Sequence, residues 1–409
     1  MLNEKGNREL AYLVIIDDVI KHPNADRLDI AKVGGWHVIT GLNEFKKGDI
    51  AIYFEIDSKL PEVKPFTNME FLASKHFKIK SQKIRGEISQ GLLVKPEDLG
   101  WELVYDIRDD FPGCKDTNGN YHFPNEESRF LTDIIGVTYY VVEDNKRKAP
   151  SFDKYKKMAQ RHPKVFSNSI IRKIYKNEIG KRILFIFFGR GVKSRNWPDW
   201  VTKTDEERVQ NMPWILEQKG PWIVTEKIDG TSTTFSIRRG KGFFKKNELY
   251  ICSRNVVFDN PNKSCYYDTN VYVEMAEKYH IESVLTKMLE ELNVDWVTIQ
   301  GETYGNKIQN RDYNMSGHDF RAFNLVTPTG RWGSVEAKEY LKSFGIPFVP
   351  ILDTNYMLPD TVDDLLNYAD GTSVIDGFER EGVVLRTKDG KQSFKAVSNI
   401  FLLKYHGKD

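Results

Sequence analysis

The sequence lacks the features that mark secreted, membrane-spanning and zinc-binding proteins. Its 409 residues include only three cysteines and no Cys-x-x-Cys pair, which argues against a disulfide framework and a structural zinc site. No apolar run approaches the ~18 residues that a membrane-spanning helix needs. The N-terminal stretch MLNEKGNREL has no apolar signal-peptide core. We therefore expect an intracellular, cytoplasmic protein that does not associate with membranes.

Two common active-site motifs are also missing. There is no Gly-x4-Gly-Lys-Ser/Thr stretch, so a nucleotide would not be held by a P-loop. There is no His-Glu-x-x-His stretch, and the eight histidines do not have the spacing of metal ligands. Any catalytic chemistry has to come from other residues.

Charge is nearly balanced over the whole chain but not along it. The formal net charge is +2, with 29% charged and 40% hydrophobic residues, the composition of a globular protein. A balanced total can hide a basic face. Residues 151–182 hold ten lysines and arginines against one aspartate and one glutamate. This run predicts either a solvated helical face or a contact with phosphate groups.

The chain divides into three parts by pattern, and its length favours more than one core. Residues 1–145 show short apolar runs separated by turn residues, which predicts an all-β barrel or sandwich. Residues 146–197 are polar and lysine-rich with helical spacing, which predicts a basic helical connector. Residues 198–409 mix strand and helix patterns. A loop near Cys114 resembles an insertion in the first part.

These patterns predict particular strands and helices. In the first part the expected strands are Leu10–Val19, Ile30–Val33, Trp36–Ile39, Ile50–Ile56 and Ile88–Val94. In the third part they are Trp222–Ile237, Leu249–Ser253, Trp296–Glu302, Phe320–Val326, Gly382–Thr387 and Ser393–Val397. The expected helices of the third part are Tyr272–Leu292, Ser334–Phe344 and Val362–Tyr368.

The stretch PWIVTEKIDGTSTTFSI, residues 221–237, places a lysine and an aspartate within an apolar β pattern. In a strand, residues two apart share a face, so Lys227 and Asp229 would project together while Ile228 points the other way. Gly230 then permits a tight turn. The pattern Lys-x-Asp-Gly predicts either a functional lysine and carboxylate pair or an exposed hairpin end.

Other charged residues occupy comparable positions further along the chain. Glu302 lies in one β run, Glu381 begins another, and Lys395 lies inside a third. Each of them alone could be a surface charge at a strand end. Together with Lys227 and Asp229 they supply two lysines and three carboxylates, the set needed to handle a polyphosphate with a hard divalent cation.

The order of these motifs resembles that of the covalent nucleotidyltransferases, which comprise RNA ligases, DNA ligases and mRNA-capping enzymes. The motifs are EKIDG (226–230), SRN (253–255), QGETYG (300–305), FRAFNL (320–325), EGVVLR (381–386) and SFKAVS (393–398). They cover the chain from about Arg208 to Lys404. The resemblance implies an α+β nucleotidyltransferase domain, ATP-grasp-like and with antiparallel sheets.

The N-terminal part indicates the branch of this superfamily. HPNADRLDIAKV (22–33), GD (48–49) and KIRGEISQGLL (83–93) resemble an OB-fold of the tRNA-binding type. DNA ligases and capping enzymes carry an OB-fold after the last motif, where only Ile400–Asp409 follow here. With TDEERVQN (204–211) before the lysine strand, the chain is most similar to the nick-sealing RNA ligase 5 family. The basic connector and the loop near Cys114 depart from that pattern.

This resemblance implies a multidomain protein. An OB-fold nucleic-acid-binding domain would occupy residues 1–145, the helical connector 146–197 and the nucleotidyltransferase domain 198–409. The activity implied is that of an ATP-dependent RNA ligase sealing 3′-hydroxyl/5′-phosphate breaks at nicks in duplexes. A DNA ligase, a capping guanylyltransferase and a catalytically inactive nucleic-acid-binding protein remain alternatives.

The resemblance also implies roles for individual residues. Lys227 would attack ATP and carry AMP as a phosphoramidate, with Lys395 and Glu381 assisting the transfer. The nucleotide-binding residues implied are Glu226, Lys227, Ile228, Arg208, Arg254, Glu302, Phe323, Lys395 and Lys404. The metal ligands implied, for Mg²⁺ or Mn²⁺, are Asp229, Glu302 and Glu381.

For two of these roles, more than one residue is a candidate. Phe323 would stack on adenine, with Phe320 as the fallback. Ligases of this superfamily often have Lys-x-Lys in the last motif, but this chain has Val397 at the second position. Lys404 would then be the replacement for the second lysine.

The partner implied is RNA, or a nicked duplex of RNA and DNA, and no protein partner is implied. The OB-like domain would bind nucleic acid through one face of its barrel. Candidate contacts are Lys78, Lys80, Lys83 and Arg85, of which Lys78 and Lys80 alternate onto a shared face. The alternative is a solvated strand edge protected by lysines.

Overall fold

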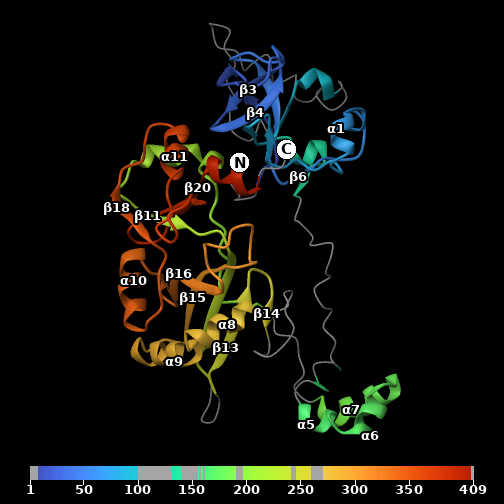
Figure 1. Ribbon diagram of the computed structural model, residues 1–409, viewed down its shortest axis with the longest axis vertical. Coiled ribbons are helices and arrows are strands. Elements are labelled where there is room, and N and C mark those ends of the chain that lie inside the picture. Colours follow the sequence, from blue (N-terminus) through green and yellow to red (C-terminus); the bar gives the residue numbers. More distant parts are fainter. Residues whose placement is uncertain are drawn as a thin grey trace.

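The computed structural model describes residues 8–99, 130–139, 155, 158–159, 162–189, 197–240, 246–258 and 270–406. Figure 1 shows two β-rich domains, the N-terminal one in blue and the C-terminal one in yellow to red, and a helical segment in green. Among the helices in these ranges, none has the length and apolar character needed to cross a membrane. The predicted loop near Cys114 lies outside the described residues.

The N-terminal domain is built from short antiparallel strands. They are β1 (Ala11–Ile15), β2 (Asp18–Lys21), β3 (Leu28–Val33), β4 (Trp36–Gly41), β5 (Ile50–Phe54), β6 (Ser58–Lys59), β7 (Gln82–Ile84), β8 (Glu87–Ser89), β9 (Leu92–Val94) and β10 (Thr138–Tyr139), with the short helices α1 (Glu70–Ala73) and α3 (Thr132–Ile135). These strands form two three-stranded sheets, β1-β5-β9 and β2-β3-β4, and two two-stranded sheets, β6-β10 and β7-β8. Trp36 and Tyr53 from the two sheets are fully buried, with ring centroids 6.2 Å apart.

Two predicted strands of this domain are each divided in the structure. The predicted strand Leu10–Val19 forms β1 and part of β2, which pair in different sheets. The predicted strand Ile88–Val94 is interrupted at Gly91, whose φ is +118°. A Cβ atom on Gly91 would stand 2.2 Å from the ring of Tyr53, so only glycine fits this close approach.

The segment predicted as a basic connector contains helices α5 (Pro163–Phe166), α6 (Ser169–Tyr175) and α7 (Glu178–Phe188). Asn168 and Asn177 accept hydrogen bonds from backbone N–H groups in the first turns of α6 and α7, at 2.9 and 2.8 Å. Such N-caps satisfy donors that a helix leaves unpaired. Met158, Phe166 and Leu184 form a small core between these helices.

The C-terminal domain contains two antiparallel sheets and the helices that cover them. Its strands are β11 (Trp222–Lys227), β12 (Thr231–Arg238), β13 (Glu248–Ser253), β14 (Val257–Phe258), β15 (Trp296–Gly305), β16 (His318–Thr327), β17 (Gly330–Arg331), β18 (Ile351–Tyr356), β19 (Gly382–Arg386) and β20 (Ser393–Val397). Its helices are α8 (Val271–Lys278), α9 (Ile281–Glu291), α10 (Ser334–Ser343), α11 (Val362–Ala369) and α12 (Asn399–Phe401). The larger sheet has the order β14-β13-β12-β15-β16-β17 and the smaller one β18-β11-β19-β20.

Three expectations for this domain need correction. The predicted strand Trp222–Ile237 is two strands, β11 and β12, which belong to different sheets. The predicted helix Tyr272–Leu292 breaks into α8 and α9 at His280, whose φ is +48°. Strand β18 has no counterpart among the predicted strands, because its sequence ILDTNY lacks a regular apolar alternation and stays partly exposed.

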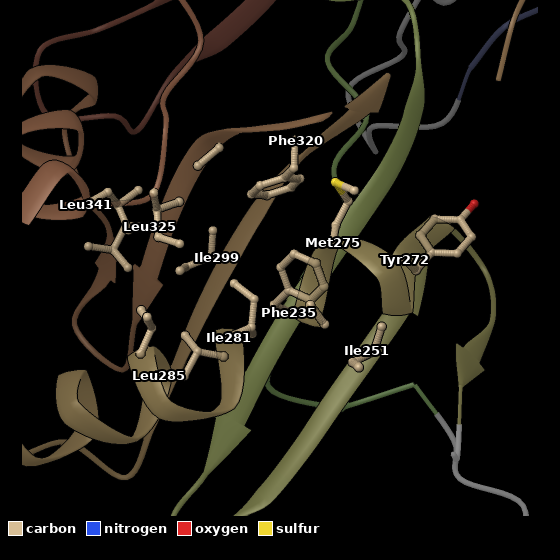
Figure 2. Packing of buried hydrophobic residues seen from close by; sticks show 14 of the residues in the cluster. Phe235, Ile251, Tyr272, Met275, Ile281, Leu285, Ile299, Phe320, Leu325 and Leu341 are labelled. Atoms are coloured by element: carbon tan, nitrogen blue, oxygen red, sulfur yellow. The ribbon is translucent and has the colours of Figure 1, made fainter. Parts of the chain in front are cut away.

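The larger sheet carries the main hydrophobic core. Figure 2 shows apolar side chains of α8, α9 and α10 meeting those of the sheet. Phe235 of β12 and Phe320 of β16 are fully buried, with ring centroids 5.2 Å apart. Leu285 of α9 and Leu341 of α10 belong to the same core. This burial, the dominant favourable contribution to folding, holds β12 and β15 side by side.

The two domains meet at a charged contact. On the β3–β4 hairpin, Nζ of Lys32 and Nε2 of His37 lie 3.0 and 3.5 Å from the carboxylate oxygens of Asp363 in the first turn of α11. The nearby imidazole of His37, together with the hydrogen bond from Lys32 and against the effect of burial, lowers the pKa of Asp363 to about 2. A Cβ atom on Gly35 would stand 2.4 Å from Cγ1 of Val362, so the hairpin packs tightly against α11.

The core beneath α10 offers a direct test of this packing. Replacing the fully buried Leu341 by alanine should reduce the free energy of unfolding of the C-terminal domain by about 2–5 kcal/mol, because it leaves a cavity. Replacing Val335, on the same helix but 41% exposed, should change it by less than about 0.5 kcal/mol. Urea unfolding followed by tryptophan fluorescence measures both, and equal effects would contradict the packing described.

Candidate active site

The predicted reactive lysine lies where the two sheets of the C-terminal domain join. Lys227 is the last residue of β11 in the smaller sheet, and Thr231 is the first residue of β12 in the larger one. Residues 228–230 make the turn between them. The expectation that Lys227 and Asp229 share the face of one strand is therefore wrong, because the strand ends at Lys227. Asp229 lies instead in the turn at the seam.

Strand β15 approaches this turn closely. Ser232 of β12 is paired with Glu302 of β15. A Cβ atom on Gly230 would stand 2.4 Å from the carbonyl oxygen of Thr303 and 2.9 Å from Cγ of Glu302. Glycine at position 230 therefore permits the contact that brings Glu302 next to the Lys227–Asp229 segment.

Lys227 forms an ion pair with Glu381 at the seam. Its Nζ lies 2.6 Å from Oε1 of Glu381, and both side chains are mostly buried. The register of β11 and β19 pairs Lys227 with Gly382, which brings the preceding Glu381 alongside. Burial lowers the pKa of Lys227, but the carboxylates of Glu381 and Glu302 more than offset this, and the pKa is raised.

The three predicted metal-binding carboxylates lie within electrostatic reach of one another. Burial raises the pKa of Glu302 to about 8. The charge of Lys227 lowers this pKa, whereas the charges of Glu381 and Asp229 raise it further. Burial and the charge of Glu381 raise the pKa of Asp229 to about 7. The cluster thus holds more negative charge than its surroundings stabilise, and a cation would relieve the repulsion.

The donor set fits a divalent ion that is shared with a bound molecule. Within the part of the chain that the structure describes, the buried Oε2 of Glu381 has no hydrogen-bond partner. In the same ranges, no three His, Cys, Asp or Glu side chains are arranged to hold an ion by themselves. Mg²⁺ is usually bound by one or two carboxylates, water and the phosphates of a substrate. The carboxylates present fit that mode.

Lys395 and Arg208 bring positive charge to the same seam. Lys395 lies in β20, and its backbone N–H donates to the carbonyl of Glu207 at 2.8 Å, which aligns the segment of Arg208 beside the strand. Burial lowers the pKa of Lys395, and the charges of Arg208 and Lys227 add to the effect. In the described ranges, the buried Nη1 of Arg208 has no hydrogen-bond partner, so an anion could bind there.

Asp205 joins the two cations that were predicted to contact the nucleotide. Its carboxylate forms an ion pair with Arg254, and its Oδ1 lies 3.4 Å from Nζ of Lys395. The neighbouring Glu206 lies 3.0 Å from Arg386 and 3.6 Å from Arg331. The acidic run TDEE therefore holds this segment against the smaller sheet.

Sequence reasoning did not assign a function to Asp205 or Glu206. The motif TDEERVQN indicated only Arg208, which ends the acidic run. Three consecutive acidic residues directly before a predicted phosphate-binding arginine were the available signal. Their partners lie between 49 and 190 positions further along, so the pairing itself could not be predicted.

Two predicted nucleotide-binding residues use their side chains within the protein. Both carboxylate oxygens of Glu226 accept hydrogen bonds, from the hydroxyl of Ser373 at 2.5 Å and the backbone N–H of Val374 at 2.9 Å. Ile228 is 4% exposed and belongs to the hydrophobic core. Any contact of these two residues with a nucleotide would therefore involve the backbone.

The aromatic candidates differ in exposure. Phe320 is fully buried against Phe235, which leaves no room for a base on its ring. Phe323 is only partly buried, and the guanidinium of Arg386 lies 5.8 Å from its ring centroid. Phe323 is therefore the better candidate for stacking.

The remaining predicted residues lie away from this cluster of contacts. Lys404 is in the π-helical turn Leu402–His406 and pairs with Glu379 at 2.6 Å. In the N-terminal domain, Lys78 and Lys80 flank the buried Ile79, as their alternation predicts. Arg85 lies exposed in the β7–β8 turn next to Lys83.

Two family models match the chain. The RNA ligase family matches residues 220–405, which hold β11 to β20 and all the carboxylates of the seam. An OB-fold domain family matches residues 10–96. Two curated relatives, the phenylalanine–tRNA ligase beta subunits of Geobacter sulfurreducens and Geobacter metallireducens, are 31% and 30% identical over 99 residues. The match spans 23% of this chain and only 11% of each of theirs.

Solved structures similar to the whole chain are RNA ligases from Naegleria gruberi. A variant with ATP and Mn is 24% identical, with a TM-score of 0.65 over 98% of this chain and 100% of that one. A variant with AMP and Mn and an apo variant are each 25% identical, with TM-scores of 0.64 over the same shares. The likeness extends through both β domains. Residues 220–405 thus match the RNA ligase family, and residues 10–96 match an OB-fold domain family.

Proposed function

We propose that the protein is an ATP-dependent RNA ligase that seals 3′-hydroxyl/5′-phosphate breaks at nicks in duplexes, with AMP carried covalently on Lys227. The ion pair of Lys227 with Glu381, 2.6 Å long at the seam of the two sheets, is the observation that carries the proposal. This ion pair places an amine beside a carboxylate, and Asp229, Glu302 and Lys395 lie around it. The Naegleria gruberi relatives, solved with ATP, AMP, pyrophosphate or Mn, support the choice of nucleotide and metal.

The first displacement would form the lysyl-AMP. Nζ of Lys227 attacks the α-phosphorus of ATP, so that an N–P bond forms, the bond to pyrophosphate breaks and the amine loses a proton. Only the neutral amine is nucleophilic, and the nearby carboxylates keep Lys227 protonated in this structure. Glu381 lies within hydrogen-bond distance of Nζ and is the group positioned to receive the proton.

Asp229, Glu302 and Glu381 would hold the divalent ion, Mg²⁺ or Mn²⁺. When bound, it supplies positive charge that neutralises the carboxylates and the phosphates of ATP. Carboxylates neutralised in this way stabilise the ammonium form of Lys227 less, so the amine loses its proton more readily. Glu302 would also accept hydrogen bonds from the ribose hydroxyls.

The cations of the site would bind the phosphates. Lys395 would neutralise charge that develops on the α-phosphate. Arg208 would contact the phosphates of ATP, and Arg254 the ribose or the 5′ end of the donor strand, through their guanidinium groups. The buried Nη1 of Arg208, which has no hydrogen-bond partner among the described residues, supports this role. Phe323 would stack on adenine.

The same residues would serve two further displacements. An oxygen of the 5′-phosphate attacks the phosphorus of AMP, the N–P bond breaks and Lys227 regains a proton. The 3′-hydroxyl then loses its proton and attacks the 5′-phosphorus, which expels AMP and joins the strands. Because each step is an in-line displacement, positioning and charge stabilisation provide most of the catalysis.

The first prediction concerns the covalent intermediate. Wild-type protein incubated with α-labelled ATP and Mn²⁺ should retain label after denaturation, and Lys227→Ala should reduce the label to background because the nucleophile is gone. Lys391→Ala is the matched control, since the side chain of Lys391 is 82% exposed on a loop. Label from GTP but not ATP would overturn the choice of nucleotide, and retained label in the Lys227 variant would exclude this lysine.

A second prediction follows from the raised pKa values of Glu302 and Asp229. Below about pH 7–8 these carboxyls are protonated, and a proton must leave before an ion binds. The Mn²⁺ concentration for half-maximal labelling should therefore fall by roughly tenfold or more between pH 6 and 7, depending on whether one or both protons leave, and level off above pH 8. Thermal stabilisation by Mn²⁺ alone should increase over the same range. A metal requirement that is equal at pH 6 and pH 9 would contradict the assignment of these ligands.

A third prediction concerns the OB-fold domain. Replacing Lys83 and Arg85 together by alanine should weaken binding of a nicked duplex by about tenfold at low salt, and reduce the slope of affinity against salt concentration. Formation of lysyl-AMP should be unchanged, because both residues lie in the β7–β8 hairpin of the other domain. Unchanged nick affinity would favour the alternative of lysines that merely protect a strand edge.

A further inference from the structure

The loop between β15 and β16 leaves the sheet directly beside the seam. Its ends are close together, since the backbone N–H of Asn306 donates to the carbonyl of Gly317 at 3.1 Å. Within it, Lys307, Tyr313 and Asn314 have φ values of +60°, +55° and +54°. Residues other than glycine rarely adopt this backbone conformation unless the surrounding structure holds it. We call residues 306–317 the clamp loop.

The clamp loop holds the turn that follows Lys227 at two points. The backbone N–H of Asp229 donates to the hydroxyl of Tyr313 at 2.7 Å. Nε2 of Gln309 donates to the carbonyl of Gly230 at 3.0 Å. Both backbone groups belong to the turn, so two side chains of one loop fix the orientation of the peptide unit before Asp229 and of the one after Gly230.

Tyr313 is well suited to accept the hydrogen bond from Asp229. The residue is 3% exposed, and its ring centroid lies 5.0 Å from that of the equally buried Tyr304. Burial raises the pKa of Tyr313 further above its usual value, so the hydroxyl stays neutral. A buried N–H group that loses its acceptor destabilises the folded structure around it.

Arg311 connects the clamp loop with the segment that leads to Glu381. Its Nε lies 3.1 Å from Oδ2 of Asp376, its Nη2 bonds the other carboxylate oxygen, and its Nη1 bonds the carbonyl of Glu379. The side chains of Arg311 and Asp376 are each 3% exposed. The same guanidinium lies 4.2 Å from the ring centroid of Tyr313, within the range of a cation–π contact.

We propose that Tyr313 and Arg311 are positioning residues for the adenylylation step. Tyr313 holds Asp229 through its backbone, and Arg311 fixes Tyr313 relative to the chain that ends in Glu381. The clamp loop thereby sets the distance between two of the metal-binding carboxylates, Asp229 in the turn between the sheets and Glu381 directly before β19. This inference rests on the proposed function, since it assigns the loop a role in the same reaction.

The test uses Tyr313→Phe in the full-length protein, because this change removes one oxygen and keeps the ring. The single-turnover rate of lysyl-AMP formation at saturating ATP should fall by about tenfold or more, since Asp229 loses its backbone acceptor. The Mn²⁺ concentration for half-maximal rate should rise, and the KM for ATP should change little. Arg311→Lys should have the same effect in weaker form, because lysine lacks the bidentate geometry.

Tyr304→Phe is the matched control. Its hydroxyl is buried beside Tyr313 but accepts its hydrogen bond from Nε of Arg321 at 3.1 Å, away from Asp229. This variant should lower the melting temperature to a similar extent and leave the rate and the metal requirement unchanged. If Tyr313→Phe behaves like Tyr304→Phe, with a change in stability alone, the positioning role is overturned.

A direct measurement of Mn²⁺ binding by electron paramagnetic resonance separates this inference from the proposed function. Weaker binding in Tyr313→Phe than in wild type supports the role of the clamp loop even if wild-type protein takes no label from ATP. Equal binding by wild type, Tyr313→Phe and Tyr304→Phe overturns it. Absence of label in wild-type protein that binds Mn²⁺ would count against the ligase proposal alone.

Discussion

The ion pair of Lys227 and Glu381 is the interaction on which the architecture of the site depends. Two mostly buried charges tolerate removal from water only when their geometry is well supported. Here the support comes from the strand register, because β11 and β19 pair Lys227 with Gly382 and so bring Glu381 alongside. Gly382, with a φ of +152°, has no space for a side chain, since a Cβ atom would stand 2.2 Å from the carbonyl of Ala396.

The rest of the domain places further charged groups on both sides of this ion pair. The larger sheet brings Glu302 and the end of the turn to one side, on the core formed by Phe235 and its neighbours. The smaller sheet brings Glu381 and Lys395 to the other side. Since Lys227 and Glu302 belong to different sheets, small movements of one sheet against the other would change the distances between the charged groups.

Much of the site could be predicted from the sequence, and the reasons are local. Lys227, Glu302, Glu381 and Lys395 lie in or next to strongly apolar strands, where a charge without a function would be costly. Strands, α10 and α11 were also predicted, because their apolar periodicity is regular. The division of residues 222–237 between two sheets was not, since periodicity does not report which strands pair.

Long-range partners were equally beyond local reasoning. Tyr313 and Arg311 belong to a polar loop whose sequence NKIQNRDYNMSG has no apolar pattern, and their contacts are with residues 65 to 84 positions away. In the sequence, Asp363 is only an acidic residue near the start of a predicted helix. Nothing there indicates its ion pair with Lys32 across the domain boundary. Such contacts follow from the assembled tertiary structure.

The position of Asp205 has a consequence for how strongly any anion can bind. Arg254 and Lys395 already share one carboxylate, so their positive charge is partly compensated before a ligand arrives. A phosphate that binds both cations has to exchange with this carboxylate, and the observed affinity is then the difference between two competing ion pairs. Added salt screens both pairs in the same sense, so affinity would respond to ionic strength less steeply than two bare cations would require.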